Sequence, residues 1–264
     1  MSKPFGLENG GNNCYFNSLI QGMLSCEPFY KLIMEKKPTS GVGGAIYRLC
    51  IGATSSVSEI KRELSRYKSI YQGNAQECAF ETYDFLIESM KDIGVPKLFT
   101  NRIRRTITCT CGHVTKVPIE SPYFILFVNK RHHSSLLGAL NEVEALQDYK
   151  CDKCHMLGTS KSTSEVSMVP EILTIVLEQY TPAGKQLFSL EDTIRIPKKP
   201  DGEFVYKKIA SLEHYGSNGG GHYVCIAERD GICYMFNDSS ISSGAMLITN
   251  NSYLIFYKCI YNTI

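Results

Sequence analysis

The chain has 264 residues, of which 43% are hydrophobic and 20% are charged, and its formal net charge is +2. These values are typical of one globular domain with a sizeable core, and they argue against a general nucleic-acid binder. The longest apolar runs have the length of a strand, so the sequence predicts no membrane-spanning segment. The polar start MSKPFGLENG lacks a signal-peptide core, and eleven cysteines then indicate a reducing compartment, so we expect a cytoplasmic or nuclear protein.

The first third of the chain predicts helices. Apolar side chains recur at helical spacing from Cys14 to Leu24, and the segments 59–67 and 75–93 show the same period, with Gly94 as a stop. The Gly- and Ser-rich stretches PTSGVGGAIY and GATSSVS predict the connections between these helices.

The rest of the chain is richer in strand patterns. From about residue 102, β-branched residues alternate on both sides of a CTC motif, and the segment 135–147 predicts one more helix. After Pro170 the patterns are mainly those of strands, and RDG at 229–231 predicts a hairpin turn. This order of elements predicts an α+β fold.

Cys14 lies where the first helical pattern begins, inside the stretch GLENGGNNCYFNSLIQ. The free N–H groups and the positive dipole end of a helix stabilise a thiolate there, and the thiolate is the reactive form of cysteine. Asn12 and Asn13 are available as helix caps, and the glycines before them allow a tight turn. The alternative is an inert buried cysteine, so a catalytic hypothesis also needs a base.

The far end of the chain supplies a base and a group to orient it. In GHYVCIAERDGICYMFND, His222 begins one predicted strand, and Asn237 and Asp238 end the next. In an antiparallel hairpin these ends lie side by side, so one of the two residues can hold one ring nitrogen of His222. The other nitrogen would accept the thiol proton. The alternative is an ordinary histidine on an edge strand.

Five stretches together resemble the ubiquitin-specific proteases, a papain-like family of cysteine deubiquitinases. The segments around Cys14 and His222 are similar to the family's cysteine and histidine boxes. Three more segments match in the family's order, and the matches run from residue 6 to residue 259: QGNAQECAFETYDFL, VPEILTIVLEQY and YLIFYKC.

This resemblance implies a role for each matching residue. Cys14 matches the nucleophile, His222 the general base and Asn237 the third member of the triad. Asp238 matches a supporting polar residue. Asn9, five residues before the cysteine, matches the asparagine whose side chain donates to the oxyanion.

Three further residues are expected to bind the substrate by the same resemblance. Glu77 and Asn74 match positions that face the basic C-terminal tail of ubiquitin, and Tyr223 belongs to the histidine box. Asn74 stands where the family usually has Asp, which weakens the attraction to arginine. This departure leaves a ubiquitin-like modifier open as the substrate.

Four cysteines form two pairs about forty residues apart: Cys109 with Cys111, and Cys151 with Cys154. Four thiolates make a closed tetrahedral zinc site that stabilises a small β subdomain, and in the family such pairs hold zinc at the tip of the fingers. We therefore expect structural zinc and no cofactor for catalysis. The first pair is one residue closer than the usual C-x-x-C. Two alternatives stay open, since His113 or His155 can replace one thiolate, or the cysteines hold no metal.

We therefore expect a single papain-like catalytic domain, with a helical thumb over 1–100, β fingers over 101–170 and a β palm over 171–264. The expected activity is thiol-dependent hydrolysis of the isopeptide or peptide bond after the C-terminal glycine of ubiquitin. The alternatives are a deconjugase of a ubiquitin-like modifier and a non-catalytic ubiquitin-binding module. The expected partners are ubiquitin and ubiquitinated proteins, with no nucleic acid and no membrane, and we expect a monomer.

Overall fold

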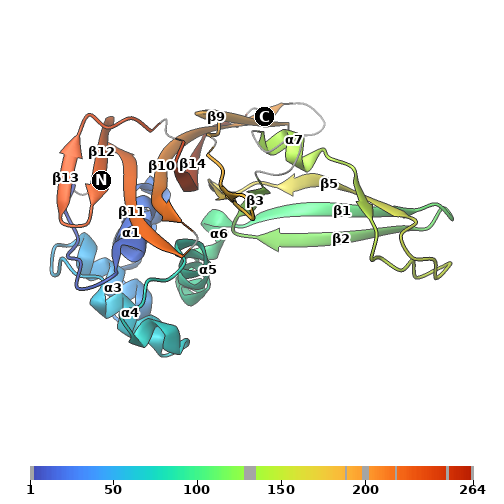
Figure 1. The fold of residues 1–264 in the computed structure, drawn as a ribbon. Coiled ribbons are helices and arrows are strands. Elements are labelled where there is room, and N and C mark those ends of the chain that lie inside the picture. The colour runs from blue at the N-terminus through green and yellow to red at the C-terminus, as the bar shows by residue number, and fades with distance from the viewer. Residues whose placement is uncertain are drawn as a thin grey trace.

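The computed structural model describes residues 3–127, 135–187, 189–197, 202–217, 219–247 and 250–262. The described chain begins with helices, continues into a four-stranded sheet and ends mainly in a larger eight-stranded sheet (Figure 1). This arrangement confirms the predicted α+β class. Within the described residues, no helix is both long enough and apolar enough to cross a membrane.

The helical part lies between residues 14 and 99. Its elements are α1 (Cys14–Ser25), α2 (Glu27–Lys36), α3 (Gly41–Cys50), α4 (Ser58–Ser65), η1 (Ser69–Gln72), α5 (Ala79–Ser89), η2 (Lys91–Ile93) and α6 (Pro96–Phe99). The helices predicted within 59–67 and 75–93 are confirmed as α4 and α5. Gly94 ends η2 in the left-handed region, with φ 88°, which a glycine adopts without strain.

The larger sheet runs in the order β13-β12-β11-β10-β14-β6-β3, with β9 beside β10. Its strands are β3 (Phe124–Phe127), β6 (Ile172–Glu178), β9 (Thr193–Pro197), β10 (Glu203–Ser217), β11 (Gly220–Arg229), β12 (Ile232–Asn237), β13 (Ser240–Ser243) and β14 (Ser252–Asn262). A short ribbon joins β7 (Tyr180–Thr181) and β8 (Gly184–Lys185). The predicted hairpin turn between β11 and β12 is confirmed, and Asp230 and Gly231 have positive φ there, as a two-residue turn requires.

The smaller sheet runs in the order β2-β1-β5-β4. Its strands are β1 (Asn101–Cys109), β2 (Val114–Ser121), β4 (Glu144–Leu146) and β5 (Ser160–Met168). In Figure 1, β1, β2 and β5 project away from the helices and the larger sheet. No side chain of the described strand β2 is fully buried, so this sheet has little core of its own. Its strands lie within the predicted fingers range 101–170, whereas β3 from that range joins the larger sheet.

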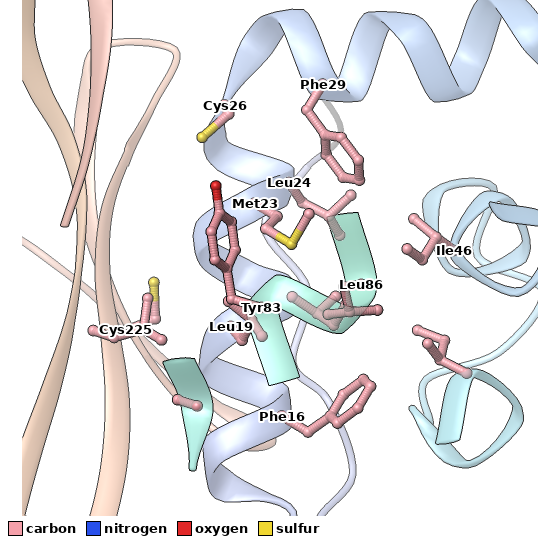
Figure 2. Packing of buried hydrophobic residues seen from close by; sticks show 14 of the residues in the cluster. Phe16, Leu19, Met23, Leu24, Cys26, Phe29, Ile46, Tyr83, Leu86 and Cys225 are labelled. Atoms are coloured by element: carbon pink, nitrogen blue, oxygen red, sulfur yellow. The ribbon is translucent and has the colours of Figure 1, made fainter. Parts of the chain in front are cut away.

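The helix α1 forms the centre of the helical part, and all of its residues are buried. Figure 2 shows Leu19 and Met23 of α1 in the same buried cluster as Tyr83 of α5 and Cys225 of β11. A Cβ on Gly22 would lie 2.9 Å from side-chain atoms of the sheet, so glycine allows the helix to pack closely there. This packing fixes the start of α1, which holds the predicted nucleophile, against the larger sheet.

Arg229, at the end of β11, ties the other end of α1 to the same sheet. Its guanidinium is buried, and it donates from Nε to Ser25 Oγ at 2.9 Å and from Nη2 to the Gln21 carbonyl at 3.1 Å. Burial lowers the pKa of Arg229 to about 10, so the group is still charged at neutral pH. A cation at the last turn of a helix is favourable for the helix dipole.

Two segments differ from their prediction. The Gly- and Ser-rich stretch expected as a connection contains α3, because Gly44 lets the helix lie against the preceding backbone; a Cβ there would lie 2.8 Å from the Thr39 carbonyl carbon. The segment 135–147, expected as a helix, forms only the short α7 (Leu136–Leu140) before β4 pairs with β5. Tertiary pairing overrides local helix propensity in this second case.

Candidate active site

The predicted nucleophile, Cys14, is the first residue of α1, and 4% of it is exposed. The N–H groups at this helix end favour a negative sulfur. The predicted capping is wrong, since α1 has no side-chain cap. Instead, the Asn13 side-chain oxygen accepts a hydrogen bond from Lys61 Nζ at 2.7 Å, and Asn12 Nδ2 donates to the Asn74 carbonyl at 2.9 Å.

The predicted base and its partner come together at the ends of β11 and β12. His222 Nε2 lies 2.7 Å from Asn237 Oδ1, across the antiparallel hairpin. An amide oxygen only accepts, so Nε2 carries the proton. Nδ1 is then the nitrogen that can take a proton from a thiol.

Asp238 lies beside this pair but has other partners. Its carboxylate accepts from Asn9 Nδ2 at 2.8 Å and from Asn17 Nδ2 at 2.7 Å, and its carbonyl accepts from the Leu7 N–H at 2.9 Å. Of the two residues that the sequence offered as partners of His222, the structure therefore brings Asn237 to the imidazole. Asp238 instead ties the segment before Cys14 to the end of β12.

Asn9 has a fixed side chain. Its Oδ1 accepts from the backbone N–H groups of Gly11 at 3.2 Å and Asn13 at 3.0 Å, which leaves only the amide nitrogen to donate. One N–H of that nitrogen goes to Asp238, and the second remains for another acceptor. A thiol at a helix start, an oriented imidazole and a fixed amide donor are the groups that acyl transfer requires.

The three predicted substrate-binding residues have different environments. Asn74 is exposed, and Glu77 is half-buried on the segment before α5. Tyr223 is only 7% exposed, because its ring packs on His214 at a centroid distance of 4.4 Å and on Tyr253 at 5.8 Å. Tyr223 is thus part of the core beneath the site and presents little surface.

The sequence reasoning missed Gln76. Its Nε2 lies 3.7 Å from Cys14 Sγ and donates to the Gly221 carbonyl at 2.6 Å. The available signal was its place in the same family-like stretch, between Asn74 and Glu77. The resemblance predicts roles only for Asn74 and Glu77 within that stretch.

His214 packs against Tyr223 and lies close to Gly221, the residue before His222. It is 4% exposed, its Nδ1 meets the Tyr180 hydroxyl, and its pKa is lowered to about 4 by burial and by the charges of Lys185 and His222. A Cβ on Gly221 would lie 2.6 Å from His214 Nε2 and 2.4 Å from the Tyr215 carbonyl. Glycine is therefore required directly before His222.

The four predicted metal ligands form one cluster at the end of the smaller sheet. Their sulfur atoms all lie within 4.8 Å of one another, with Cys109 to Cys154 at 3.7 Å and Cys111 to Cys151 at 3.8 Å. In a tetrahedral zinc site with Zn–S bonds of about 2.3 Å, the sulfurs lie about 3.8 Å apart. The spacing therefore fits a metal ion held by four thiolates, and neither His113 nor His155 belongs to the cluster.

Turns in the backbone make this cluster possible despite the short first pair. The Gly112 N–H donates to the Cys109 carbonyl at 2.9 Å, and φ at Gly112 is 82°. In the second pair, the His155 N–H donates to the Cys151 carbonyl at 2.9 Å. The Thr159 hydroxyl and the Cys111 N–H lower the pKa of Cys109 to about 5, which favours the thiolate that a metal binds.

A family model described as ubiquitin carboxyl-terminal hydrolase matches residues 5–257 of the chain. The chain belongs to this family. Ubiquitin carboxyl-terminal hydrolase 23 of Arabidopsis thaliana is 23% identical over 303 residues, which cover 96% of this chain and 35% of that protein. Ubiquitin carboxyl-terminal hydrolase 42 of Homo sapiens is 23% identical over 304 residues, which cover 96% of this chain and 22% of that protein. The chain therefore spans about a third or less of the length of these two hydrolases.

Solved structures of the family share the fold. A SAGA DUB module bound to monoubiquitin matches with a TM-score of 0.84 at 17% identity, over 98% of this chain and 70% of that chain. The SAGA Ubp8/Sgf11/Sus1/Sgf73 DUB module bound to ubiquitin aldehyde matches with a TM-score of 0.83 at 17% identity, over the same shares. These matches confirm the fold that the family resemblance predicted.

Proposed function

We propose that the chain is a cysteine-type deubiquitinase that hydrolyses the isopeptide or peptide bond after the C-terminal glycine of ubiquitin. The observation that carries this proposal is the His222–Asn237 pair, which is linked to Cys14 through Gly221 and the Gln76 amide, in a chain that belongs to the hydrolase family. The names of the relatives, and a structural neighbour bound to ubiquitin aldehyde, support ubiquitin as the modifier.

The site supplies each step of such a hydrolysis. The Cys14 thiol gives its proton to Nδ1 of His222, and the sulfur attacks the carbonyl carbon of the terminal glycine. Asn9 donates to the oxyanion. The C–N bond breaks as the imidazolium protonates the leaving lysine amine. Water then gives a proton to the imidazole and attacks the thioester, which releases the glycine carboxylate and the free thiol.

The four-cysteine cluster would hold a structural zinc ion. Its sulfur spacing and its four protein ligands support this role, because a site with four protein ligands has no open position for a substrate. The ion would hold together the end of a sheet that buries few side chains. On the same sheet, the Arg105 side chain donates to the buried Ser162 at 2.7 Å, and its ion pair with Glu144 at 3.1 Å is partly exposed and adds little stability.

The partners in this proposal are ubiquitin and ubiquitinated proteins, with the chain acting as a monomer and without nucleic acid or membrane. A nucleophilic thiol and four metal-binding thiolates work only while they are reduced. A cytoplasmic or nuclear location suits both groups.

Labelling with ubiquitin that carries a C-terminal electrophile tests this function. The wild-type chain should form a covalent adduct, and Cys14→Ala should lose the adduct and at least about 10⁴-fold of the turnover, as expected when a nucleophile is removed. Cys259→Ala, at a half-buried thiol of β14, is the matched control and should still react. If Cys14→Ala retained turnover, Cys14 would not be the nucleophile.

The same electrophile on ubiquitin-like modifiers separates the alternatives. A reaction with one of these probes, and none with ubiquitin, would keep the mechanism and change the substrate. Ubiquitin binding without reaction of any probe would support the non-catalytic module.

A further inference from the structure

Gln76 is the side chain that joins the helical part to the larger sheet at the nucleophile. It lies on the segment before α5, and its amide contacts Cys14 Sγ at 3.7 Å. The same amide bonds to both backbone groups of Gly221 in β11. Nε2 donates to the carbonyl oxygen at 2.6 Å, and Oε1 accepts from the N–H at 3.4 Å.

This position is notable because the hydrogen bonds of the described residues do not join Cys14 directly to His222. Cys14 begins a helix of the first part of the chain, whereas His222 lies on β11, more than two hundred residues later. Gln76 contacts the sulfur and also holds Gly221, the residue directly before His222. This amide therefore adds a direct link between the nucleophile and the strand of the base, beside the packing of α1 on the larger sheet.

The chemistry of the amide suits an anionic sulfur. Its nitrogen has two N–H groups, so one can donate to the Gly221 carbonyl while the other points at Cys14 Sγ. A hydrogen bond to an ionised acceptor is about twice as strong as one to a neutral acceptor. The contact should therefore stabilise the thiolate more than the thiol.

We propose that Gln76 is a further catalytic residue, which donates to the Cys14 thiolate. Through Gly221, the same side chain also positions His222. The role in turnover rests on the proposed function, but the effect on the thiol can be measured without ubiquitin.

Other charged and titratable groups surround the sulfur, and a test must leave them unchanged. Tyr15 and Tyr223 interact electrostatically with Cys14, and burial raises the pKa of both, so they are neutral near pH 7. Four more charged or titratable groups belong to residues that adjoin Cys14 or its contacts. Lys61 donates to Asn13, Glu77 follows Gln76, His222 follows Gly221, and Asp238 accepts from Asn17. Substitution of Gln76 alone keeps each of these residues in the chain.

The experiment measures alkylation of Cys14 by iodoacetamide between about pH 5 and pH 9, which covers the usual range of activated thiols. Mass spectrometry of the peptide that contains Cys14 separates this thiol from the other cysteines. Gln76→Met keeps the approximate size but removes the donor, so the rate near pH 6 should fall about tenfold and the midpoint of the pH profile should rise by about one unit. Gln76→Glu places a negative charge near the sulfur and should shift the midpoint at least as far.

Gln72→Met is the matched control, since Gln72 is an exposed glutamine four residues earlier. It should leave the alkylation rate and midpoint of Cys14 unchanged. In the ubiquitin assay, Gln76→Met should lower kcat about tenfold or more with a smaller change in KM, which a merely structural loss would not produce.

The proposal is wrong if either folded Gln76 variant alkylates within about twofold of wild type at every pH, because a lost bond to a charged group costs more than that. It is also wrong if neither variant folds, since Gln76 would then be a structural residue. If Cys14 of the wild-type chain is alkylated normally but the chain does not cleave ubiquitin, the proposed function is wrong. The alkylation profiles of the variants would still decide the role of Gln76.

Discussion

The region around Cys14 and the cysteine cluster of the smaller sheet hold their polar side chains in different ways. Around Cys14, the functional side chains come from several segments of the chain and bond to one another above a large core. In the cluster, four thiols lie on two short turns at the end of a sheet with few buried side chains. The first arrangement depends on packing across the whole fold, and the second on local turns and, in our proposal, on a metal ion.

A substitution in one of the two regions should therefore have little effect on the stability of the other. Cys14, Tyr223 and Phe236 belong to one continuous core, so a change there affects the helices and the sheet together. Among the described strands of the smaller sheet, the buried hydrophobic residues are Ile107 and Cys109, and the other buried residues are polar: Asn101, Ser160 and Ser162. A change at the cysteines should then act on that sheet and leave the active site intact.

The largest expected effect is loss of the metal ion through Cys151→Ser. Zinc binding contributes roughly 10–16 kcal/mol in small zinc domains, so the end of the smaller sheet should lose its order without it. We expect about one metal ion per wild-type chain and far less in the variant. Amide exchange over residues 101–121 and 144–168 should rise, while α1 stays protected.

Cys233→Ser, at a half-buried cysteine of β12 outside the cluster, is the control and should retain the metal. Unchanged exchange in the smaller sheet after metal loss would contradict the comparison, because the sheet would then be stable through its own packing.

A smaller effect is expected at Lys61 and Asn13, on the active-site side of the comparison. Burial lowers the pKa of Lys61, and its Nζ donates to Asn13 Oδ1 at 2.7 Å and to the Gly73 carbonyl at 3.3 Å. Asn13→Ala leaves a buried cation with one long hydrogen bond, so the free energy of unfolding should fall by about 2–3 kcal/mol. Denaturant unfolding of Asn13→Ala, Lys61→Met and the double variant should give a coupling of about 1–2 kcal/mol.

Lys97→Met, at an exposed lysine of α6, should change the free energy of unfolding by less than about 0.5 kcal/mol. If the effects of Asn13→Ala and Lys61→Met added within about 0.3 kcal/mol in the double variant, the contact between Lys61 and Asn13 would contribute nothing measurable to stability.

The smallest expected effect is a loss of folding stability at acidic pH that comes from His214. The pKa of His214 is about 4 in the folded chain and about 6.5 in the unfolded chain. Between these values the unfolded chain binds more protons, so stability is present above pH 6.5 and is lost as the pH falls toward 4. At pH 5 this loss should be about 2 kcal/mol relative to pH 8.

Denaturant unfolding of wild type and His214→Phe at both pH values isolates this contribution, since all other titrating groups are common to the two chains. The difference in stability between the chains should shrink at pH 5. An equal difference at both pH values would show that His214 titrates normally in the folded chain.

Several elements followed from local patterns in the sequence. The start of α1 at Cys14 came from helical spacing, and the β11–β12 hairpin came from the RDG turn between alternating segments. The α3 helix did not follow from a local pattern, because Gly44 is needed for close contact with the Thr39 backbone, which such a pattern does not show. The β4 strand was missed for a similar reason, since it forms by pairing with β5.

The sequence alone determined the α+β class and the family and supplied the candidate nucleophile, the candidate base and the two cysteine pairs, because each depends on residues that are near one another in the chain. The family resemblance also assigns Asn237 to His222. Only the tertiary structure decided that Asp238 binds Asn9 and Asn17 instead of sharing that role, and that Gln76 reaches Cys14 from 62 residues away and Gly221 from 145. Those contacts depend on strand register and on the packing of α1 against the sheet. Both are set by the whole core, because a side chain finds its partner only after the elements that carry the two have been positioned.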